Sequence, residues 1–319
     1  MPNSDSRARF LAKLLLVLLP FLLAGAWLEL RLRALPTSYS QKDAGFKRMA
    51  PDLDTLVLGA SEAAEGVDAG ALGPHAYNLA NVGQSLYCDR GLFAWALPQA
   101  PKLKRVLWGV SFQSLGYHLE GTAEAWRSVS YFREFGILPE EGLRGLDFRF
   151  ASAVLFYEPF SALRWALTGQ GLGAPTLTAT GQDPLPCYSD DDLLDIKINP
   201  RTAAQRAATH EGLTHMDAVD ANLGEIKALK RLADARGVSV ALFFLPVTKD
   251  YAQAINGDQR KLMVGRLKSL AAEQGMELKD YFQDPRFGDG DFFDVDHLCS
   301  RGSEKFSAIL AKDFGSSQN

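Results

Sequence analysis

The chain has 319 residues, of which 47% are hydrophobic, and its 34 basic and 38 acidic side chains give a net charge of −4. This balance excludes the strongly basic face of a nucleic-acid-binding protein, and the length allows one sizeable core. The three cysteines, Cys88, Cys187 and Cys299, are too few for a disulfide framework or a zinc knuckle. They leave room for one disulfide, whose pairing the sequence does not define.

The N-terminal segment is apolar and follows basic residues. Three basic side chains within residues 7–13 precede an unbroken apolar run over residues 14–28. Counted from Phe10, the segment has 19 residues and nearly spans a hydrocarbon core of roughly 30 Å. Basic residues ahead of it predict a cytoplasmic N-terminus and a periplasmic or extracellular body. The segment therefore predicts a membrane anchor over residues 1–36.

A cleaved signal peptide is the alternative interpretation of this segment. Ala24-Gly25-Ala26 fits the small-x-small pattern of a cleavage site. The apolar run continues past that site, however, and the segment "ELRLR" (residues 29–33), with three charged side chains, follows as an interfacial stop. This continuation favours the uncleaved anchor.

Short apolar runs alternate with helical patterns in the rest of the chain. Buried strands are expected at "DTLVLGAS", near residues 106–110 and 238–245, and in a shorter form at "MELKDY". Helical stripes run through residues 223–233 and 263–270, each followed by a terminating glycine, Gly237 or Gly275. Alternating strands and helices predict an α/β domain over residues 37–319, with a mainly parallel sheet covered on both faces.

The segment 114–206 differs from this pattern, because aromatic residues are dense in it and periodicity is weak. It is expected to be an insertion over the carboxyl ends of the strands, where ligand sites form in open α/β sheets. Its part 151–167 has a second interpretation, contact with the membrane surface. The candidates for stacking on sugar rings are Trp126, Tyr131, Phe132 and Tyr157.

A serine and a histidine–aspartate pair are the candidate catalytic residues. Ser61 lies two residues beyond Gly59, directly after the first predicted strand, so its hydroxyl is expected at the carboxyl edge of the sheet. Asp294 and His297 are three residues apart, close enough for the carboxylate to hold one ring nitrogen while the other faces a serine. The other four histidines have no acid three residues before them.

These residues have three other interpretations. The acids around His297 could hold Ca²⁺, but they lack the glycine and the glutamate of an EF-hand loop; they are Asp289, Asp291, Asp294 and Asp296. An α/β-hydrolase is disfavoured because Ala63 stands where Gly-x-Ser-x-Gly requires its last glycine. Cys299 is a poor candidate nucleophile because it lies on the same loop as the histidine, and it is expected to be a buried small residue.

The order of these motifs resembles the SGNH (GDSL-type) hydrolase superfamily. The matching pieces are "VLGASEAAEGVDAGAL", "NLANVGQSL" and "DFFDVDHLCSRGSEKFS". More narrowly, the chain is similar to the membrane-anchored branch that includes alginate O-acetylation proteins and the teichoic acid D-alanyl transfer protein. The resemblance implies a three-layer α/β/α sandwich. It also implies Ser61 as nucleophile, His297 as general base and Asp294 as its orienting acid, with the N–H groups of Gly83 and Ser61 facing the oxyanion.

Two positions depart from the family pattern. Gly-Ala-Ser replaces Gly-Asp-Ser, and the asparagine expected after the second main strand is absent, with Ser111 and Gln113 in its place. Loss of one oxyanion donor costs about 3 kcal/mol, or roughly a hundredfold in rate. Gln113, Asn81 or Gln84 could substitute for it.

The resemblance implies a membrane-anchored serine O-acyltransferase or esterase that acts on a cell-surface or exported polysaccharide. Acetyl is the expected acyl group, and a membrane-bound acyl-donor protein is the expected partner. No cofactor, metal or nucleic acid is expected. The alternative is a catalytically weak or inactive scaffold or glycan-binding subunit of a polysaccharide export or modification complex, favoured by the missing asparagine.

Overall fold

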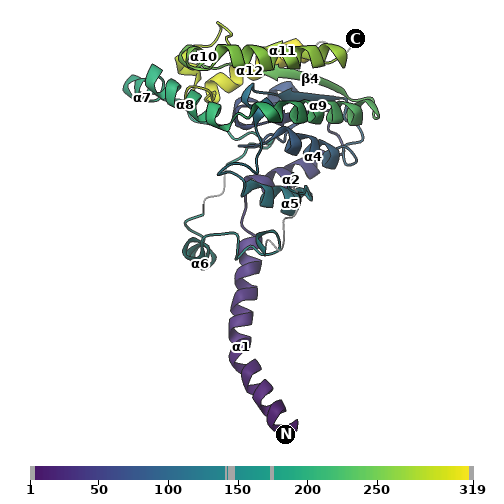
Figure 1. Ribbon diagram of the computed structural model, residues 1–319, viewed down its shortest axis with the longest axis vertical. Coiled ribbons are helices and arrows are strands. Elements are labelled where there is room, and N and C mark those ends of the chain that lie inside the picture. The colour runs from purple at the N-terminus through teal and green to yellow at the C-terminus, as the bar shows by residue number, and fades with distance from the viewer. Residues whose placement is uncertain (1–3, 141, 143–147, 173–175, 316–319) are drawn as a thin grey trace. The chain divides into compact units, whose positions relative to one another are not determined.

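The computed structural model describes residues 4–140, 142, 148–172 and 176–315. The chain divides into two compact units (Figure 1). One unit consists of Met1–Thr37 and Gly142–Pro175, and the other of Ser38–Glu141 and Thr176–Asn319. The segment 114–206 is thus divided between the units, and its residues 141, 143–147 and 173–175 lie outside the described part.

The second unit is built on a sheet whose described strands are all parallel, in the order β2-β1-β3-β4-β5. The strands are β1 (Thr55–Gly59), β2 (Ala76–Asn78), β3 (Arg105–Gly109), β4 (Ser239–Phe244) and β5 (Glu277–Asp280). Strand β2 was not expected from the sequence, because three residues are too few to show a period. The expected α/β class with a parallel sheet is confirmed.

Side chains alternate between the two faces of the sheet and feed two separate cores. On β1, Leu56 and Leu58 enter one core and Val57 enters the other. The first core packs against helices on one face: α2 (Ser38–Met49), α4 (Leu86–Ala96), α9 (Val219–Asp234) and α11 (Gly257–Glu273). Of these, α4 and α9 lie side by side (Figure 1). The second core packs against α3 (Ser61–Gly66) and α12 (Ser300–Gly315). The result is the three-layer α/β/α sandwich implied by the resemblance to SGNH hydrolases.

Shorter elements connect these layers in the second unit. They are η1 (Ala69–Leu72), η2 (Gln113–Gly116), α5 (Arg127–Phe135), α7 (Asp191–Lys197), α8 (Pro200–Leu213), η4 (Met216–Ala218), α10 (Lys249–Ala254) and η5 (Asp289–Asp291). Helix α8 begins with a capping box: the Asn199 side chain accepts from the backbone N–H of Thr202, whose hydroxyl lies against the backbone N–H of Asn199. This cap fixes the start of the helix that carries two residues of the candidate site.

The first unit contains the long helix α1 (Ser4–Arg33), η3 (Phe148–Phe150) and α6 (Pro159–Thr168). Residues 7–33 of α1 are long and apolar enough to cross a membrane, a test that a signal sequence near the N-terminus also passes. A small apolar cluster joins the C-terminal end of α1 to α6, through Leu32 and Leu35 against Ala162 and Trp165.

Candidate active site

Ser61 is placed at the carboxyl edge of the sheet by a glycine turn. Strand β1 ends at Gly59, whose φ of +136° is a backbone angle that residues with a side chain rarely adopt. A Cβ atom there would also lie 2.4 Å from the carbonyl oxygen of Gly109 on β3. The turn requires glycine for both reasons. Ser61 follows as the first residue of α3, whose first backbone N–H groups have no partner within the helix.

Asp294 and His297 occupy a tight loop between η5 and α12. The Oδ1 atom of Asp294 accepts hydrogen bonds from the backbone N–H groups of Asp296 (3.1 Å) and His297 (2.8 Å). Such local bonds from an aspartate to the backbone stabilise turns. The same carboxylate lies 2.9 and 3.1 Å from Nδ1 of His297, so it can accept a hydrogen bond from that nitrogen.

The second ring nitrogen of His297 reaches Ser61. Nε2 lies 2.9 Å from Oγ of Ser61, across a sequence separation of 236 residues. The structure thus brings together the serine, histidine and aspartate selected from the sequence. When the imidazole is neutral and its Nδ1–H is held by Asp294, Nε2 can accept the serine proton, which is the geometry that nucleophilic catalysis requires.

Carboxylates around His297 favour its protonated form. Burial lowers the pKa of His297, but Asp296, Asp294 and Glu65 outweigh burial and raise the pKa to about 10. Burial raises the pKa of Asp294, whereas the hydrogen bond and charge of His297 lower it well below its usual range. The pair therefore favours an imidazolium next to a carboxylate, the charge state that follows proton transfer from the serine.

Glu65 is a site residue that the sequence did not reveal. It follows Ser61 by four residues on α3, and its Oε2 atom lies 3.7 Å from Nε2 of His297. Its side chain is 11% exposed, and within the described part of the chain its carboxyl group accepts no hydrogen bond. Burial raises the pKa of Glu65 to about 7, and the attraction of His297 opposes burial. The only sequence signal was the spacing, because residues four apart share a helix face.

A second buried network adjoins the ring of His297. Asp296, almost fully buried, accepts hydrogen bonds of 3.0 Å from Nε of Arg206 at both carboxylate oxygens, and lies 3.5 Å from Nδ1 of His297. His210 lies 3.7 Å from the same carboxylate and contacts the hydroxyl of Tyr251 through Nδ1. Burial and the charge of Arg206 lower the pKa of His210 to about 3, so this histidine is neutral. Arg206 and His210 lie four residues apart on α8, and this spacing was again the only signal.

A cavity of about 320 Å³ opens next to the serine. Ser61, Gly83 and Gln113 all line it, as do Arg127 and Arg206. Gly83 has a φ of +67°, and a Cβ atom there would lie 3.0 Å from Nε of Arg127. Gly83, the predicted oxyanion donor, thus lies at the edge of the same cavity as the serine hydroxyl.

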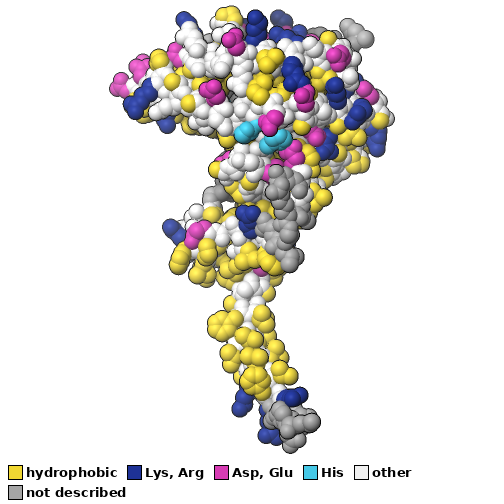
Figure 2. All heavy atoms as spheres, in the orientation of Figure 1, with side chains coloured by type: hydrophobic (Ala, Val, Ile, Leu, Met, Phe, Trp, Pro, Cys, Tyr) yellow, Lys and Arg dark blue, Asp and Glu magenta, His cyan; other side chains and the backbone are white. Residues whose placement is uncertain are grey.

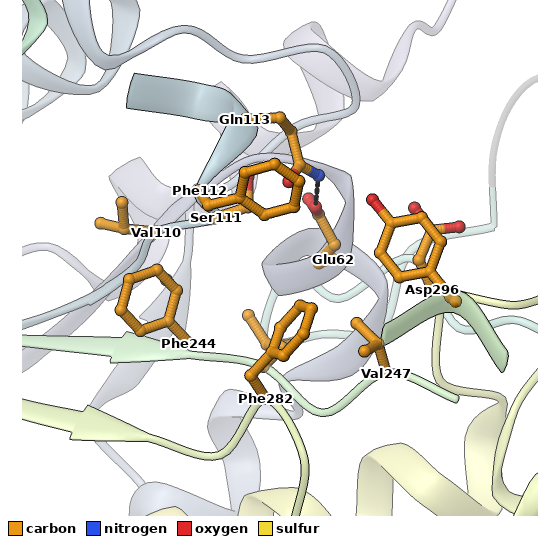
Figure 3. A pocket seen from close by; sticks show the side chains of 12 residues that line it. Glu62, Val110, Ser111, Phe112, Gln113, Phe244, Val247, Phe282 and Asp296 are labelled. Carbon is orange, nitrogen blue, oxygen red and sulfur yellow. Dashed lines mark hydrogen bonds between the residues drawn. The ribbon is translucent and has the colours of Figure 1, made fainter. Parts of the chain in front are cut away.

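The three predicted substitutes for the missing asparagine occupy different environments. Figure 3 shows the amide of Gln113 pointing toward Glu62, and its Nε2 donates a 2.7 Å hydrogen bond to that carboxylate. Gln84 also lines the cavity, but its Nε2 donates to Asp89 at 2.6 Å. Asn81 is buried, lies outside the described cavity lining and donates to the carbonyl oxygen of Leu79. Gln113 is therefore the best placed of the three, although its amide is engaged.

The structure separates the predicted aromatic residues. The prediction of Tyr131 as a stacking surface is wrong, because its ring is 1% exposed and its hydroxyl donates to Gln84. Trp126 is 40% exposed, with the guanidinium of Arg127 over its ring, and Phe132 is half-buried. Tyr157 belongs to the first compact unit.

The acids around the histidine have separate partners. Asp291 binds Nζ of Lys305 at 2.8 Å, Asp296 binds Arg206, and Asp289 is exposed. Only Asp294 and Asp296 come together, and they do so around His297. This arrangement does not gather the four carboxylates that the calcium interpretation requires.

Cys187 and Cys299 form a disulfide, which leaves Cys88 as a buried free thiol. The expectation that Cys299 is merely a buried small residue is therefore wrong in part: it is buried but oxidised. The bond joins the loop of His297 to a segment 112 residues earlier in the chain.

Of the comparisons with known proteins, only the one with solved structures finds similar chains. No family model matches the sequence, and no curated protein matches it. Among solved structures, one from Bacteroides fragilis described as an acylhydrolase is 12% identical, with a TM-score of 0.39 over 88% of this chain and 96% of that one. A GDSL-like lipase from Bacteroides thetaiotaomicron is 10% identical, with a TM-score of 0.41 over 88% and 98%.

A third solved structure, described as a platelet activating factor from Streptococcus pneumonia, is 11% identical, with a TM-score of 0.40 over 95% of this chain and 98% of that one. Similarities this low define neither an activity nor a substrate. What the structure itself shows is a parallel α/β fold with a serine directly after β1 and a histidine loop before the last helix.

Proposed function

We propose that this protein is a serine esterase or O-acyltransferase. The observation that carries the proposal is the contact of His297 with both partners, 2.9 Å from Oγ of Ser61 and 2.9 Å from Oδ1 of Asp294. Hydrogen-bond reach between nucleophile, base and orienting acid is the geometric requirement for acyl transfer to serine.

The proposed reaction has two half-reactions. Oγ of Ser61 attacks the carbonyl carbon of an ester while Nε2 of His297 takes the hydroxyl proton. The oxyanion that forms faces the backbone N–H groups of Ser61 and Gly83. Its collapse expels the alcohol, which receives the proton from His297, and leaves an acyl group on Ser61. An acceptor hydroxyl then gives its proton to His297 and attacks the acyl-enzyme. Collapse of this second oxyanion releases the acyl group on the acceptor and returns the proton from His297 to Oγ of Ser61.

The acceptor in this proposal is a hydroxyl of a cell-surface or exported polysaccharide, with water as the acceptor in an esterase, and the acyl group is acetyl. The body lies in the periplasm or outside the cell, held by α1 as a membrane anchor, and a membrane-bound protein supplies the acyl group. The disulfide supports export, because such bonds persist mainly in oxidising compartments. The roughly 320 Å³ cavity next to Ser61 has the size of a small-ligand site.

A second candidate function is a scaffold or glycan-binding subunit that retains the fold with little chemistry. The observation that favours it is the hydrogen bond from Gln113 to Glu62, which turns the amide at the position of the missing asparagine toward a carboxylate. Loss of one such donor costs about 3 kcal/mol of transition-state stabilisation.

A fluorophosphonate probe on the detergent-solubilised full chain tests the proposal. We expect covalent labelling at Ser61 that is lost in Ser61→Ala and strongly reduced in His297→Ala. Thr209→Ala is the control, because this hydroxyl lines the same cavity, donates to the carbonyl oxygen of Gln205 and should leave labelling unchanged when removed. Labelling that persists in Ser61→Ala would refute Ser61 as the nucleophile. Absence of labelling from the wild type, with polysaccharide binding intact, would refute the enzyme in favour of the scaffold.

A further inference from the structure

Helix α6 in the first unit has apolar side chains on two opposite faces. One face buries Ala162, Trp165 and Ala166 in the cluster shared with α1. The other face exposes Phe160, Leu163 and Leu167, which are 84%, 45% and 67% exposed. These three residues have the i, i+3, i+7 spacing of a single helical stripe. Side chains of this size on one stripe are typical of a surface that something covers.

The segment that carries α6 is fixed to the C-terminal turns of α1. Glu29 of α1 accepts hydrogen bonds from the hydroxyl of Ser152 (2.9 Å) and from the backbone N–H groups of Ala153 (2.9 Å) and Val154 (3.0 Å). Nη2 of Arg33 donates to the carbonyl oxygen of Ala151, and the guanidinium of Arg31 lies 5.3 Å from the ring centre of Trp165. Polar bonds, a cation–π contact and the apolar cluster thus hold α6 at one defined level along α1.

That level is the place where the apolar surface of α1 ends. Large apolar side chains of α1 are exposed from Phe10 to Leu30, and the basic residues Arg31 and Arg33 follow. Figure 2 shows the hydrophobic side chains gathered along α1 and again around α6. Basic side chains at the end of a spanning helix lie at the lipid headgroups. The exposed stripe of α6 therefore lies at the same height along α1 as the end of the exposed apolar surface of that helix.

We propose that α6 lies in the plane of the membrane interface, with Phe160, Leu163 and Leu167 buried among the lipid headgroups and upper acyl chains. The proposal rests on α1 being a retained membrane anchor, as in the proposed function. Amphipathic helices of this kind bury their apolar face about 5–10 Å into the headgroup–acyl boundary. The exposed Phe148 and Leu155 of the same segment, 59% and 56% exposed, extend the apolar surface. The chain would then contact the bilayer twice, once across it and once along its surface.

Spin labels on the full chain in vesicles of phosphatidylcholine and phosphatidylglycerol test this proposal. Single cysteines replace Phe160, Leu163 or Leu167, and only the introduced thiol reacts, because Cys88 is buried and the other two cysteines are bonded. We expect these labels to be more accessible to oxygen than to a water-soluble nickel chelate. The ratio should be several-fold above that at the control Gln170→Cys, an exposed polar position just after α6. An unchanged far-UV circular dichroism spectrum shows that each variant is folded.

Three results would overturn the proposal, and they differ in what else they affect. Chelate accessibility equal to that at Gln170 would place the stripe in water. Labels shielded from both reagents would mean that protein, not lipid, covers it. A further label at Leu18→Cys reports on α1: if it too is accessible to the chelate, the membrane anchor of the proposed function fails together with the α6 contact. If Leu18 is in lipid and only the α6 labels are in water, the anchor stands and the α6 contact alone fails.

Discussion

Glu65→Gln removes one negative charge beside the proton-accepting nitrogen of His297 and keeps the size of the side chain. Ionised Glu65 favours the protonated imidazole, because its Oε2 atom lies 3.7 Å from Nε2. A general base must be neutral to accept the proton of Ser61. Removing the charge lowers the pKa of His297, so neutral imidazole is present at lower pH. The acid side of the pH–rate profile should therefore move toward lower pH.

The size of the shift follows from the distance. Two unit charges 3.7 Å apart interact by about 4.5 kcal/mol at an effective dielectric constant of about 20, equivalent to about three pKa units. Part of this attraction offsets the cost of ionising buried Glu65, whose own pKa is raised to about 7. Measured effects of a nearby opposite charge are about one to three units. We expect a shift of about one to two pH units.

The assay is the second-order rate of fluorophosphonate labelling of Ser61, measured from neutral to alkaline pH. Glu124→Gln is the control, because this carboxylate lines the same cavity but is bound to Arg127. Its profile should match that of the wild type. An unchanged midpoint in Glu65→Gln, or a midpoint moved to higher pH, would show that Glu65 does not set the charge on His297.

Three further predictions concern chemistry and stability. Asp294→Asn should reduce the labelling rate by up to about four orders of magnitude, because an amide no longer selects the required histidine tautomer. The melting temperature should change little. A labelling rate near that of the wild type would exclude the orienting role of Asp294. Reducing the Cys187–Cys299 bond should lower the free energy of unfolding by about 2–5 kcal/mol in urea titrations. The same reductant should not affect a variant with both Cys187→Ser and Cys299→Ser, and an equal loss of stability in wild type and variant would point to another cause. Gly59→Ala should lower the free energy of unfolding by about 1–3 kcal/mol or more, because of backbone strain and the close contact with a carbonyl oxygen. Gly288→Ala, where the added Cβ meets open space, should lower it by less than about 1 kcal/mol. Equal stabilities would refute the steric argument.

Local patterns explain why much of the fold could be predicted. The strands around Val57, Leu107 and Leu242 are apolar on both sides because both faces of the sheet are covered, and such runs stand out in a sequence. The loop of Asp294 and His297 was equally visible, because both residues act within one turn. Strand β2 was missed because three residues carry no recognisable period.

Long-range contacts explain what the sequence did not reveal. The roles of Glu65 and Asp296 depend on how α3, α8 and the histidine loop meet, and no local pattern encodes that meeting. Three cysteines allow three pairings, and only the folded chain selects Cys187 with Cys299. The division of residues 114–206 between two compact units also arises from tertiary contacts.

The carboxylate of Asp294 serves the backbone and the side chain of its loop at once. Its Oδ1 atom accepts hydrogen bonds from two main-chain N–H groups and also lies against Nδ1 of the imidazole. The conformation of the loop and the orientation of the ring therefore depend on the same acceptor. Alanine at this position would remove both together, and a lost activity could then reflect a misshapen loop. Asparagine retains the oxygen that the main chain uses, removes the negative charge and replaces Oδ2, the second atom facing the ring, with an N–H donor. For this reason asparagine, and not alanine, separates architecture from chemistry at this position.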